Sequence, residues 1–291
     1  IMDRVLPFID KAVSTEKPFL SVIWFHTPHL PCVAGPRHQE MYKDYPLFQR
    51  NYAGCVTAMD EQIGRLRAHL AKLDVDENTM IWFCSDNGPE SKANGQNGTA
   101  GEFRGRKRDL YEGGVRVPGL LVWPAKIAKG RSTEVPCITS DYVPTVLDAL
   151  NIDHPKANYA IDGISLMPLI ENSSKERQSP IGFMYGSRLV MNSDNYKVIS
   201  YDGGKTLQLY DMKNDRIEQK NIASQKPEIL SELKKKFDVW QESVRRSFEG
   251  EEYGRKSFDR MKQKWQSPTT VKVKSKSKKK KNSKKNNKEN K

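Results

Sequence analysis

Cysteine is scarce in this sequence, and its cysteines do not form a recognisable site. Cys32, Cys55, Cys84 and Cys137 are scattered over 291 residues with no Cys-x-x-Cys pair. This spacing excludes the usual structural zinc sites and leaves the redox compartment undecided. Cys84 lies in an expected strand and Cys55 on the apolar face of an expected helix, so we interpret both as buried thiols.

Long apolar runs are also missing. No stretch approaches the roughly 20 apolar residues that a membrane span needs. The opening residues, IMDRVLPFIDKAVSTEKP, lack the basic start and apolar block of a secretory signal and are typical of the inside of a domain. The sequence therefore predicts no membrane span and no signal peptide in this chain.

Most of the chain has little excess of charge of either sign. The net charge is +13, and the segment Lys272–Lys291 alone contributes +10 of it, with 11 lysines and one acid. A tail so rich in Lys, Ser and Asn cannot bury enough apolar surface to fold, so we expect residues 251–291 to be basic and disordered. We interpret it as a solvated tail; the alternative is a polyanion-binding segment.

The first part of the chain has the pattern of an α/β domain. Residues 19–25 and 78–85 are apolar at nearly every position, which predicts strands covered on both faces, as in a parallel sheet. Between them, residues 48–73 repeat apolar side chains at three- and four-residue steps, which predicts a long amphipathic helix. A third strand is expected at residues 117–124. A helix at 140–152 follows, with Ser140 and Asp141 as capping candidates.

After residue 175 the pattern changes. Residues 181–215 alternate short strands with glycine and Asp/Asn turns, which indicates an antiparallel meander. Residues 226–248 predict an amphipathic helix. We therefore expect a main domain at 1–175, a small sheet-and-helix subdomain at 176–250, and the tail.

Two predicted strands end in unusual chemistry. The first ends in HTPHLP, with His26 and His29, and the second in SDNG, with Asp86 and Asn87. Ligands bind at the carboxyl ends of strands in such sheets, and Ca²⁺ prefers carboxylate and amide oxygens. Ser-Asp-Asn-Gly is also good turn chemistry, and taken alone it favours a turn.

A third candidate is Lys107, within GEFRGRKRDLYEGGVRVP. A fixed ammonium near a divalent cation would neutralise an anionic ester such as a sulfate or a phosphate. The alternative is a solvated basic loop.

Together these segments resemble the sulfatase family. HTPHLP resembles its His-x-Pro segment, ENTMIWFCSDNG its Asn-Thr, strand and Ser-Asp-Asn-Gly segment, and GRKRDLYEGGVRVP its Gly-x-Lys and Tyr-Glu-Gly-Gly-x-Arg-x-Pro segment. DYVPTVLDALNI, DGISLMPLI and LYDMKNDRIEQKNIA follow in the order of the family. The resemblance covers residues 19–245, and its several ordered motifs make it specific.

The resemblance implies a role for each matched residue. Asp86 and Asn87 match the second pair of calcium ligands, and Lys107 matches the lysine that contacts the sulfate. His29 matches the histidine beside the sulfate ester, a candidate to hydrogen-bond it or to protonate the leaving oxygen. His26 has no firm assignment and is expected to line the substrate pocket.

Two further residues of the motif, Glu112 and Arg116, are interpreted as structural, placing the lysine loop. Two features of the family are absent from the sequence. No cysteine or serine lies in the Cys/Ser-x-Pro/Ala-x-Arg context that yields formylglycine, and there is no Asp-Asp pair for the rest of the calcium site. We therefore expect the back portion of a sulfatase, with a weak calcium site and no turnover by this chain alone.

The fold that the resemblance implies is a partial alkaline-phosphatase-like α/β/α sandwich with a small C-terminal antiparallel sheet and helix. The implied function is calcium-assisted hydrolysis of a sulfate ester, carried by a small molecule or a polysaccharide, in a secreted or periplasmic setting. No specific nucleic-acid partner is expected. The alternatives are a phosphonate or phosphate ester hydrolase of the same superfamily, a non-catalytic polyanion-binding fragment, and a fragment without function.

Overall fold

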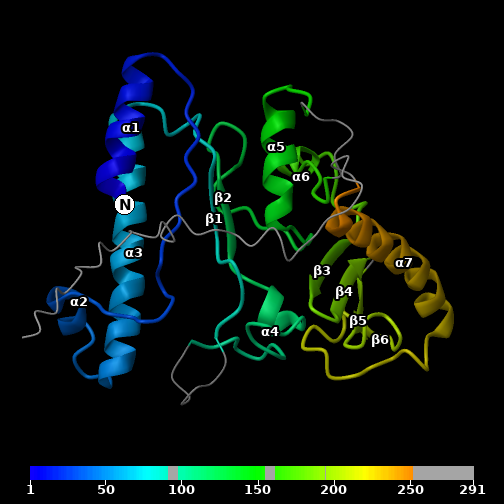
Figure 1. Cartoon of the computed structure of the whole chain (residues 1–291). Helices are drawn as coiled ribbons and strands as arrows, with labels where there is room; N and C mark the ends of the chain where they lie inside the picture. Colours follow the sequence, from blue (N-terminus) through cyan, green and yellow to red (C-terminus); the bar gives the residue numbers. More distant parts are fainter. Residues whose placement is uncertain (91–97, 155–160, 194, 252–291) are drawn as a thin grey trace, which may run out of the picture. The chain divides into compact units, whose positions relative to one another are not determined.

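A computed structural model of the chain describes residues 1–90, 98–154, 161–193 and 195–251 (Figure 1). Its contacts divide the chain into two compact units, residues 1–243 and residues 244–291. The predicted basic segment Lys272–Lys291 lies outside the described residues. In the second unit, the described residues carry the ion pair between Arg246 and Glu251 at 3.0 Å.

The first unit begins with three helices: α1 (Met2–Ser14), α2 (Pro36–Glu40) and α3 (Leu47–Lys72). Helix α3 confirms the predicted helix at 48–73. Its apolar stripe contributes Leu66 and Leu70 to a core that also contains Met2 and Ile9 of α1. Cys55 of this helix, predicted as a buried thiol, is half-buried, as is Cys84.

A two-stranded sheet lies next to this helical layer. Strands β1 (Ile81–Cys84) and β2 (Gly119–Val122) confirm two predicted strands. They pair antiparallel rather than parallel, with Ile81 opposite Val122. Ile81 packs against the α1–α3 core, whereas Trp82 packs into a second core with Leu166 and Met167. The sheet therefore has helices on both faces, as Figure 1 shows.

The predicted buried strand at residues 19–25 was wrong in part. The segment runs extended, with Phe19, Ile23 and Phe25 packed on the α1–α3 core. No described strand hydrogen-bonds to it, and its alternate side chains Leu20 and Trp24 are 76% and 85% exposed. An apolar run becomes a fully buried strand only where neighbouring strands and a second layer cover it.

A short helix, α4 (Glu112–Val115), and helices α5 (Tyr142–Ala149) and α6 (Met167–Ile170) complete this part. Helix α5 confirms the predicted helix, and Asp141 is its N-cap residue but makes no side-chain capping hydrogen bond. The Asp141 carboxylate is fully buried and accepts the backbone N–H groups of Ile138 and Ile164. Arg177 pairs with both of its oxygens at 2.8 and 3.0 Å. Asp141 thus joins distant segments.

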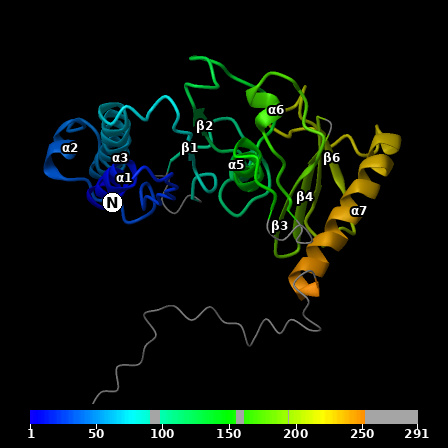
Figure 2. The ribbon, with the colours of Figure 1, turned by 90° about the horizontal axis from the view of Figure 1, so that it is seen from above.

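The C-terminal part of the first unit is the predicted antiparallel meander. Strands β3 (Ile181–Tyr185), β4 (Arg188–Ser193), β5 (Tyr196–Ser200) and β6 (Gln208–Asp211) pair in this order, and helix α7 (Pro227–Glu249) follows. Figure 2 shows α7 along one face of this sheet. Both the meander and the helix confirm the prediction.

Alternating side chains divide the sheet into two apolar faces. One face packs against α7 through Met191, Val198 and Phe237. The opposite face packs Val190 and Ile199 against residues of the loop before α4. Because strand side chains alternate with a period of two, every second residue of β5 points at that loop. The loop is the one that carries Lys107.

Candidate functional site

The turn after β1 carries the first two candidate residues, Asp86 and Asn87. Ser85 Oγ donates to the Asn87 carbonyl at 3.1 Å, and Asn87 Nδ2 donates to the Gly88 carbonyl at 2.9 Å. These local bonds are turn chemistry. Asp86 is exposed, and neither its carboxylate nor Asn87 Oδ1 has a hydrogen-bond partner among the described residues. Both oxygens remain available to a ligand.

Gly88 joins this turn to the second motif. Its N–H donates to the Gly114 carbonyl at 2.9 Å. A Cβ at Gly88 would lie 1.9 Å from the Gly113 carbonyl oxygen, and a Cβ at Gly114 would lie 2.0 Å from the Asp109 carbonyl oxygen. No side chain fits such distances, so both glycines are required for the close approach of the two backbones.

Lys107 lies on a tight turn that contacts the same segment. Its N–H donates to the Pro89 carbonyl at 2.9 Å, and Asp109 N donates to the Arg106 carbonyl at 2.8 Å. The φ of Arg108 is +77°, as the third position of a type II turn requires. The two backbone contacts at Gly88 and Pro89 thus bring the Lys107 turn to the turn of Asp86 and Asn87.

The basic side chains of this loop differ in their contacts. Arg106 donates to the carbonyls of Glu90 and Gly98 at 2.8 and 2.9 Å. Arg108 pairs with the Glu90 carboxylate. Lys107 Nζ lies 4.0 Å from Glu90 Oε2, beyond hydrogen-bond distance, and its side chain is 24% exposed. The loop is therefore structured rather than a solvated basic loop, and the anion-binding role of Lys107 stays a prediction.

The two histidines lie on the extended segment before α2. His29 Nδ1 is 2.7 Å from the Leu30 carbonyl, so Nδ1 carries a proton, and Nε2 has no hydrogen-bond partner among the described residues. The rings of His26 and His29 are 5.2 Å apart. In the described part of the chain, no hydrogen bond or ion pair joins either histidine to Asp86, Asn87 or Lys107. Their roles stay predictions.

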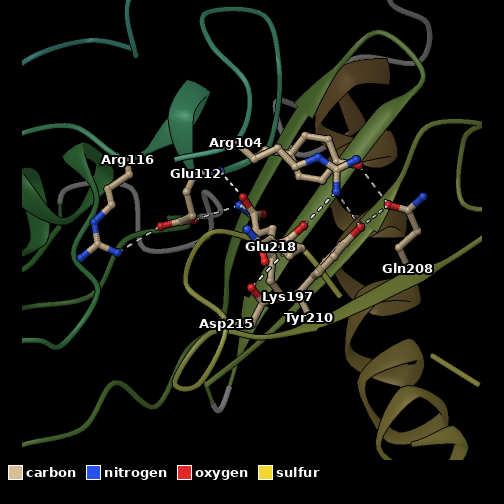
Figure 3. A network of polar contacts seen from close by, with 10 residues as sticks. Arg104, Glu112, Arg116, Lys197, Gln208, Tyr210, Asp215 and Glu218 are labelled. Atoms are coloured by element: carbon tan, nitrogen blue, oxygen red, sulfur yellow. Dashed lines mark hydrogen bonds and ion pairs between the residues drawn. The ribbon is translucent and has the colours of Figure 1, made fainter. Parts of the chain in front are cut away.

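Behind the Lys107 loop lies a buried ionic cluster (Figure 3), of which the sequence analysis named Glu112 and Arg116 but not Lys197 and Glu218. Lys197 Nζ, fully buried on β5, lies 2.9 Å from Glu112 Oε1 and 2.8 Å from Glu218 Oε1. Glu112 also accepts from Arg116 at 3.2 Å, and its N–H donates to Glu218 Oε2 at 2.6 Å. Burial raises the pKa of Glu218, and the ammonium of Lys197 opposes that rise.

Glu218 is held in this cluster against its backbone preference. Its φ is +58°, in the left-handed region that costs a non-glycine residue about 1–2 kcal/mol. The turn that carries it is fixed by Asp215, whose carboxylate accepts the N–H groups of Gln219 and Lys220 at 3.0 and 2.8 Å. The backbone strain at Glu218 persists because the surrounding contacts hold the residue in place.

A hard divalent cation fits the side-chain oxygens of Asp86 and Asn87 in chemistry but not in number. Ca²⁺ takes 6–8 oxygen ligands. Over residues 1–90, 98–154, 161–193 and 195–251, no group of three or more His, Cys, Asp or Glu side chains could hold a metal ion. The described chain thus offers two ligands of such a site.

Comparison with known proteins identifies the family. Residues 1–152 match the sulfatase family model. The chain belongs to the sulfatase family. Residues 101–243 also match the model for the C-terminal part of N-sulphoglucosamine sulphohydrolase.

Individual sulfatases are similar over part of their length. Rat steryl-sulfatase is 34% identical over 174 residues, which cover 57% of this chain and 28% of that protein. The uncharacterized sulfatase YdeN of Escherichia coli (strain K12) is 29% identical over 177 residues, 60% of this chain and 31% of that protein. This sulfatase chain therefore spans about a third of the length of these curated relatives.

Solved structures show that the fold is alkaline-phosphatase-like. The crystal structure of Ps i-CgsB in complex with k-i-k-neocarrahexaose has a TM-score of 0.73 and 25% identity, covering 82% of this chain and 53% of that one. The structure titled BT33336S-sulf has a TM-score of 0.70 and 24% identity, covering 84% of this chain and 53% of that one. In the described residues of this sulfatase chain, no helix is long and apolar enough to cross a bilayer.

Proposed function

We propose that this chain forms the cation-binding and sulfate-binding part of a sulfuric ester hydrolase that acts on a sulfated carbohydrate. The observation that carries the proposal is the pair of backbone bonds, Gly88 N to Gly114 O and Lys107 N to Pro89 O, both 2.9 Å long. They hold two candidate oxygen ligands, and an ammonium whose nearest carboxylate in the described chain is 4.0 Å away, on adjoining turns. That combination suits a tetrahedral anionic ester bound to a divalent cation.

Each residue then has one task. Asp86 and Asn87 would hold calcium, which, when bound, supplies positive charge to the sulfate oxygens. Lys107 neutralises a further sulfate oxygen as charge develops. His29, with its proton on Nδ1, presents Nε2 to the ester. Once protonated, Nε2 can donate a hydrogen bond to the ester or give its proton to the leaving oxygen. His26 lines the pocket beside it.

The nucleophile is expected elsewhere. Sulfatases generally use a formylglycine and a divalent metal, and this sequence has neither the formylglycine context nor an Asp-Asp pair. We therefore expect this chain by itself to bind without hydrolysing. A secreted or periplasmic setting remains a prediction.

A carbohydrate substrate is favoured by several relatives. The C-terminal match carries the name N-sulphoglucosamine sulphohydrolase. BT4656, which is 26% identical with a TM-score of 0.51, was solved with its substrate D-glucosamine-2-N,6-O-disulfate. Steryl-sulfatases are also relatives. The sulfate group is therefore the common feature, and the carbohydrate is the more specific part of the proposal.

Calorimetric titration with CaCl₂, and with Na₂SO₄ in the presence of calcium, tests the site. We expect a weak calcium Kd of about 1 mM, because the described residues supply two ligands. Asp86→Ala should abolish that binding, whereas Asp44→Ala, which removes another exposed carboxylate, should not. Lys107→Ala should weaken sulfate binding, whereas Lys129→Ala should not.

Two results would contradict the assignment. Calcium binding that survives Asp86→Ala would remove this residue as a ligand. Sulfate binding that is equal in the Lys107 and Lys129 variants would remove the role of Lys107. Tighter binding of inorganic phosphate than of sulfate would instead favour the phosphate or phosphonate ester hydrolase.

A further inference from the structure

The antiparallel sheet that follows in the chain holds the turn that carries Lys107 through three groups of hydrogen bonds and ion pairs, each called a grip. The gripped residues are Arg104, the pair Arg108 and Asp109, and Glu112, which are spaced four residues apart around Lys107. The gripping side chains come from β4, from β5, and from β6 with the segment after it. None of these contacts involves the Lys107 side chain itself.

The first grip is at Arg104. Its Nη1 donates to Tyr210 Oη at 3.2 Å and to the Glu218 carbonyl at 2.9 Å. The guanidinium also lies 3.8 Å from the centre of the Tyr111 ring. Figure 3 shows this arginine reaching across to Tyr210, whose hydroxyl donates onward to Gln208 at 3.0 Å. The start of the loop is thereby fixed to β6.

The second grip is directly beside Lys107. Arg188 on β4 donates from Nη1 to the Arg108 carbonyl at 2.6 Å and lies 3.4 Å from Asp109 Oδ1. The other carboxylate oxygen of Asp109 accepts the Arg106 N–H at 3.1 Å. Arg188 thus binds the carbonyl of Arg108, the third residue of the turn, and the carboxylate of Asp109, the fourth.

The third grip is the buried ionic cluster at Glu112. Lys197 and the Glu218 carboxylate together hold the side chain and the N–H of Glu112. Glu112 begins helix α4, whose Gly114 contacts both Gly88 and Asp109. A displacement of Glu112 would therefore reach both the Asp86 turn and the Lys107 turn.

We propose that Arg188 and Lys197 are positioning residues that fix where the Lys107 ammonium points. Among the described residues, Lys107 Nζ has one carboxylate near it, that of Glu90 at 4.0 Å. Its direction is therefore set by the backbone, and an error of about 1 Å in a charge-binding group is enough to weaken a site. The sheet thus takes part in sulfate binding without touching the sulfate, an inference that rests on the proposed function.

Arg188→Ala in the whole chain is the decisive variant, because the Arg188 side chain is 37% exposed and its loss should leave the fold intact. The first measurement is hydrogen exchange of the Lys107 amide, which reports the turn whether or not sulfate binds. The second is sulfate affinity in the presence of calcium. We expect exchange about tenfold faster at Lys107, unchanged exchange in β1, and sulfate binding weakened about fivefold.

Three further variants complete the test. Arg188→Lys, which can still donate one hydrogen bond, should recover part of both effects. Arg67→Ala removes an exposed arginine of α3 and should change neither measurement. The double variant Lys197→Met with Glu218→Gln removes one charge of each sign from the third grip. It should weaken sulfate binding as Arg188→Ala does.

Unchanged Lys107 exchange in the Arg188→Ala chain would overturn the positioning role. The role would also be overturned if Arg188→Ala leaves the sulfate affinity unchanged while Lys107→Ala, measured separately, weakens it. If Lys107 exchange accelerates but Lys107→Ala itself leaves sulfate affinity unchanged, the positioning stands and the proposed function of Lys107 fails.

Discussion

The extended segment 19–25 and strand β5 place their side chains in opposite environments. Trp24 is 85% exposed in a segment that is apolar at nearly every position, whereas Lys197 is fully buried in β5. Val198 and Ile199, its neighbours in β5, are equally buried. Hydrophobicity alone would have assigned the tryptophan to the core and the lysine to solvent.

Neighbours explain this difference. Strand β5 has a hydrogen-bonded strand on each side, α7 on one face and the Lys107 loop on the other. Segment 19–25 has the α1–α3 core on one side, and its outer side chains have no cover in the described chain. Two carboxylates next to Lys197 make its burial tolerable. Burial therefore follows from what surrounds a residue as well as from its type.

Substituting Lys197 and Trp24 gives the largest expected contrast in stability. Lys197→Met leaves Glu112 and Glu218 without their shared cation, which should lower the free energy of unfolding by roughly 3–5 kcal/mol. Trp24→Ala should change it by only about 0.5 kcal/mol, because the side chain is already in water. Urea denaturation followed by circular dichroism measures both.

Lys235→Met, on the exposed face of α7, is the matched control and should behave like the parent chain. A loss from Trp24→Ala as large as that from Lys197→Met would show that segment 19–25 is covered in solution, and the comparison would then break down.

The close backbone contact at Gly88 gives a second contrast, of intermediate size. Gly88→Ala would put a Cβ 1.9 Å from the Gly113 carbonyl oxygen, so we expect destabilisation of roughly 1–3 kcal/mol. Gly64→Ala, within α3 and with nothing within 4 Å of the added Cβ, should instead stabilise the chain by about 0.5–1 kcal/mol. Thermal unfolding of the two variants measures this difference. Equal midpoints would mean that the two turns are not pressed together at Gly88.

The sequence predicted the elements whose pattern is local. Helix α3, the meander and α7 each follow from a repeat of 3.6 or two residues, and no distant partner is needed to read it. The strand at 19–25 was wrong in part, and the side chain of the N-cap residue Asp141 does not cap α5, for the same physical reason. In both cases the environment is made by remote segments, as when Asp141 binds Ile164 and Arg177.

The candidate site was predicted unevenly. Asp86, Asn87 and Lys107 were found by their motifs, and two backbone bonds bring their turns together. Lys197 and Glu218 were missed, because a polar residue in a strand pattern usually faces solvent. The missed signal was the period of two, since Lys197 shares its face with Ile199 and Tyr201 rather than with the α7 side. Its partner Glu112 is 85 residues away, beyond any local pattern.

The smallest predicted effect concerns one proton in the ionic cluster. The groups facing Glu218 are the Lys197 ammonium and the N–H and carboxylate of Glu112, while Arg104 binds its carbonyl. Burial raises the pKa of Glu218 above its ordinary value of 4.5. Above pH 4.5 the unfolded chain loses this proton while the folded chain retains it, so stability falls as the pH rises toward the raised pKa.

Glu218→Gln removes this contribution and keeps an oxygen for the Glu112 N–H. The parent chain should therefore be most stable relative to the Gln variant below pH 4.5, and this advantage should shrink as the pH rises from there through the raised pKa. Urea denaturation of both chains at a series of pH values measures the difference directly, and groups that titrate alike in both chains cancel. A parent advantage that grows with pH would mean that Lys197 outweighs burial and holds Glu218 ionised. The Lys197 ammonium would then stabilise the ionised carboxylate of Glu218 by more than burial destabilises it.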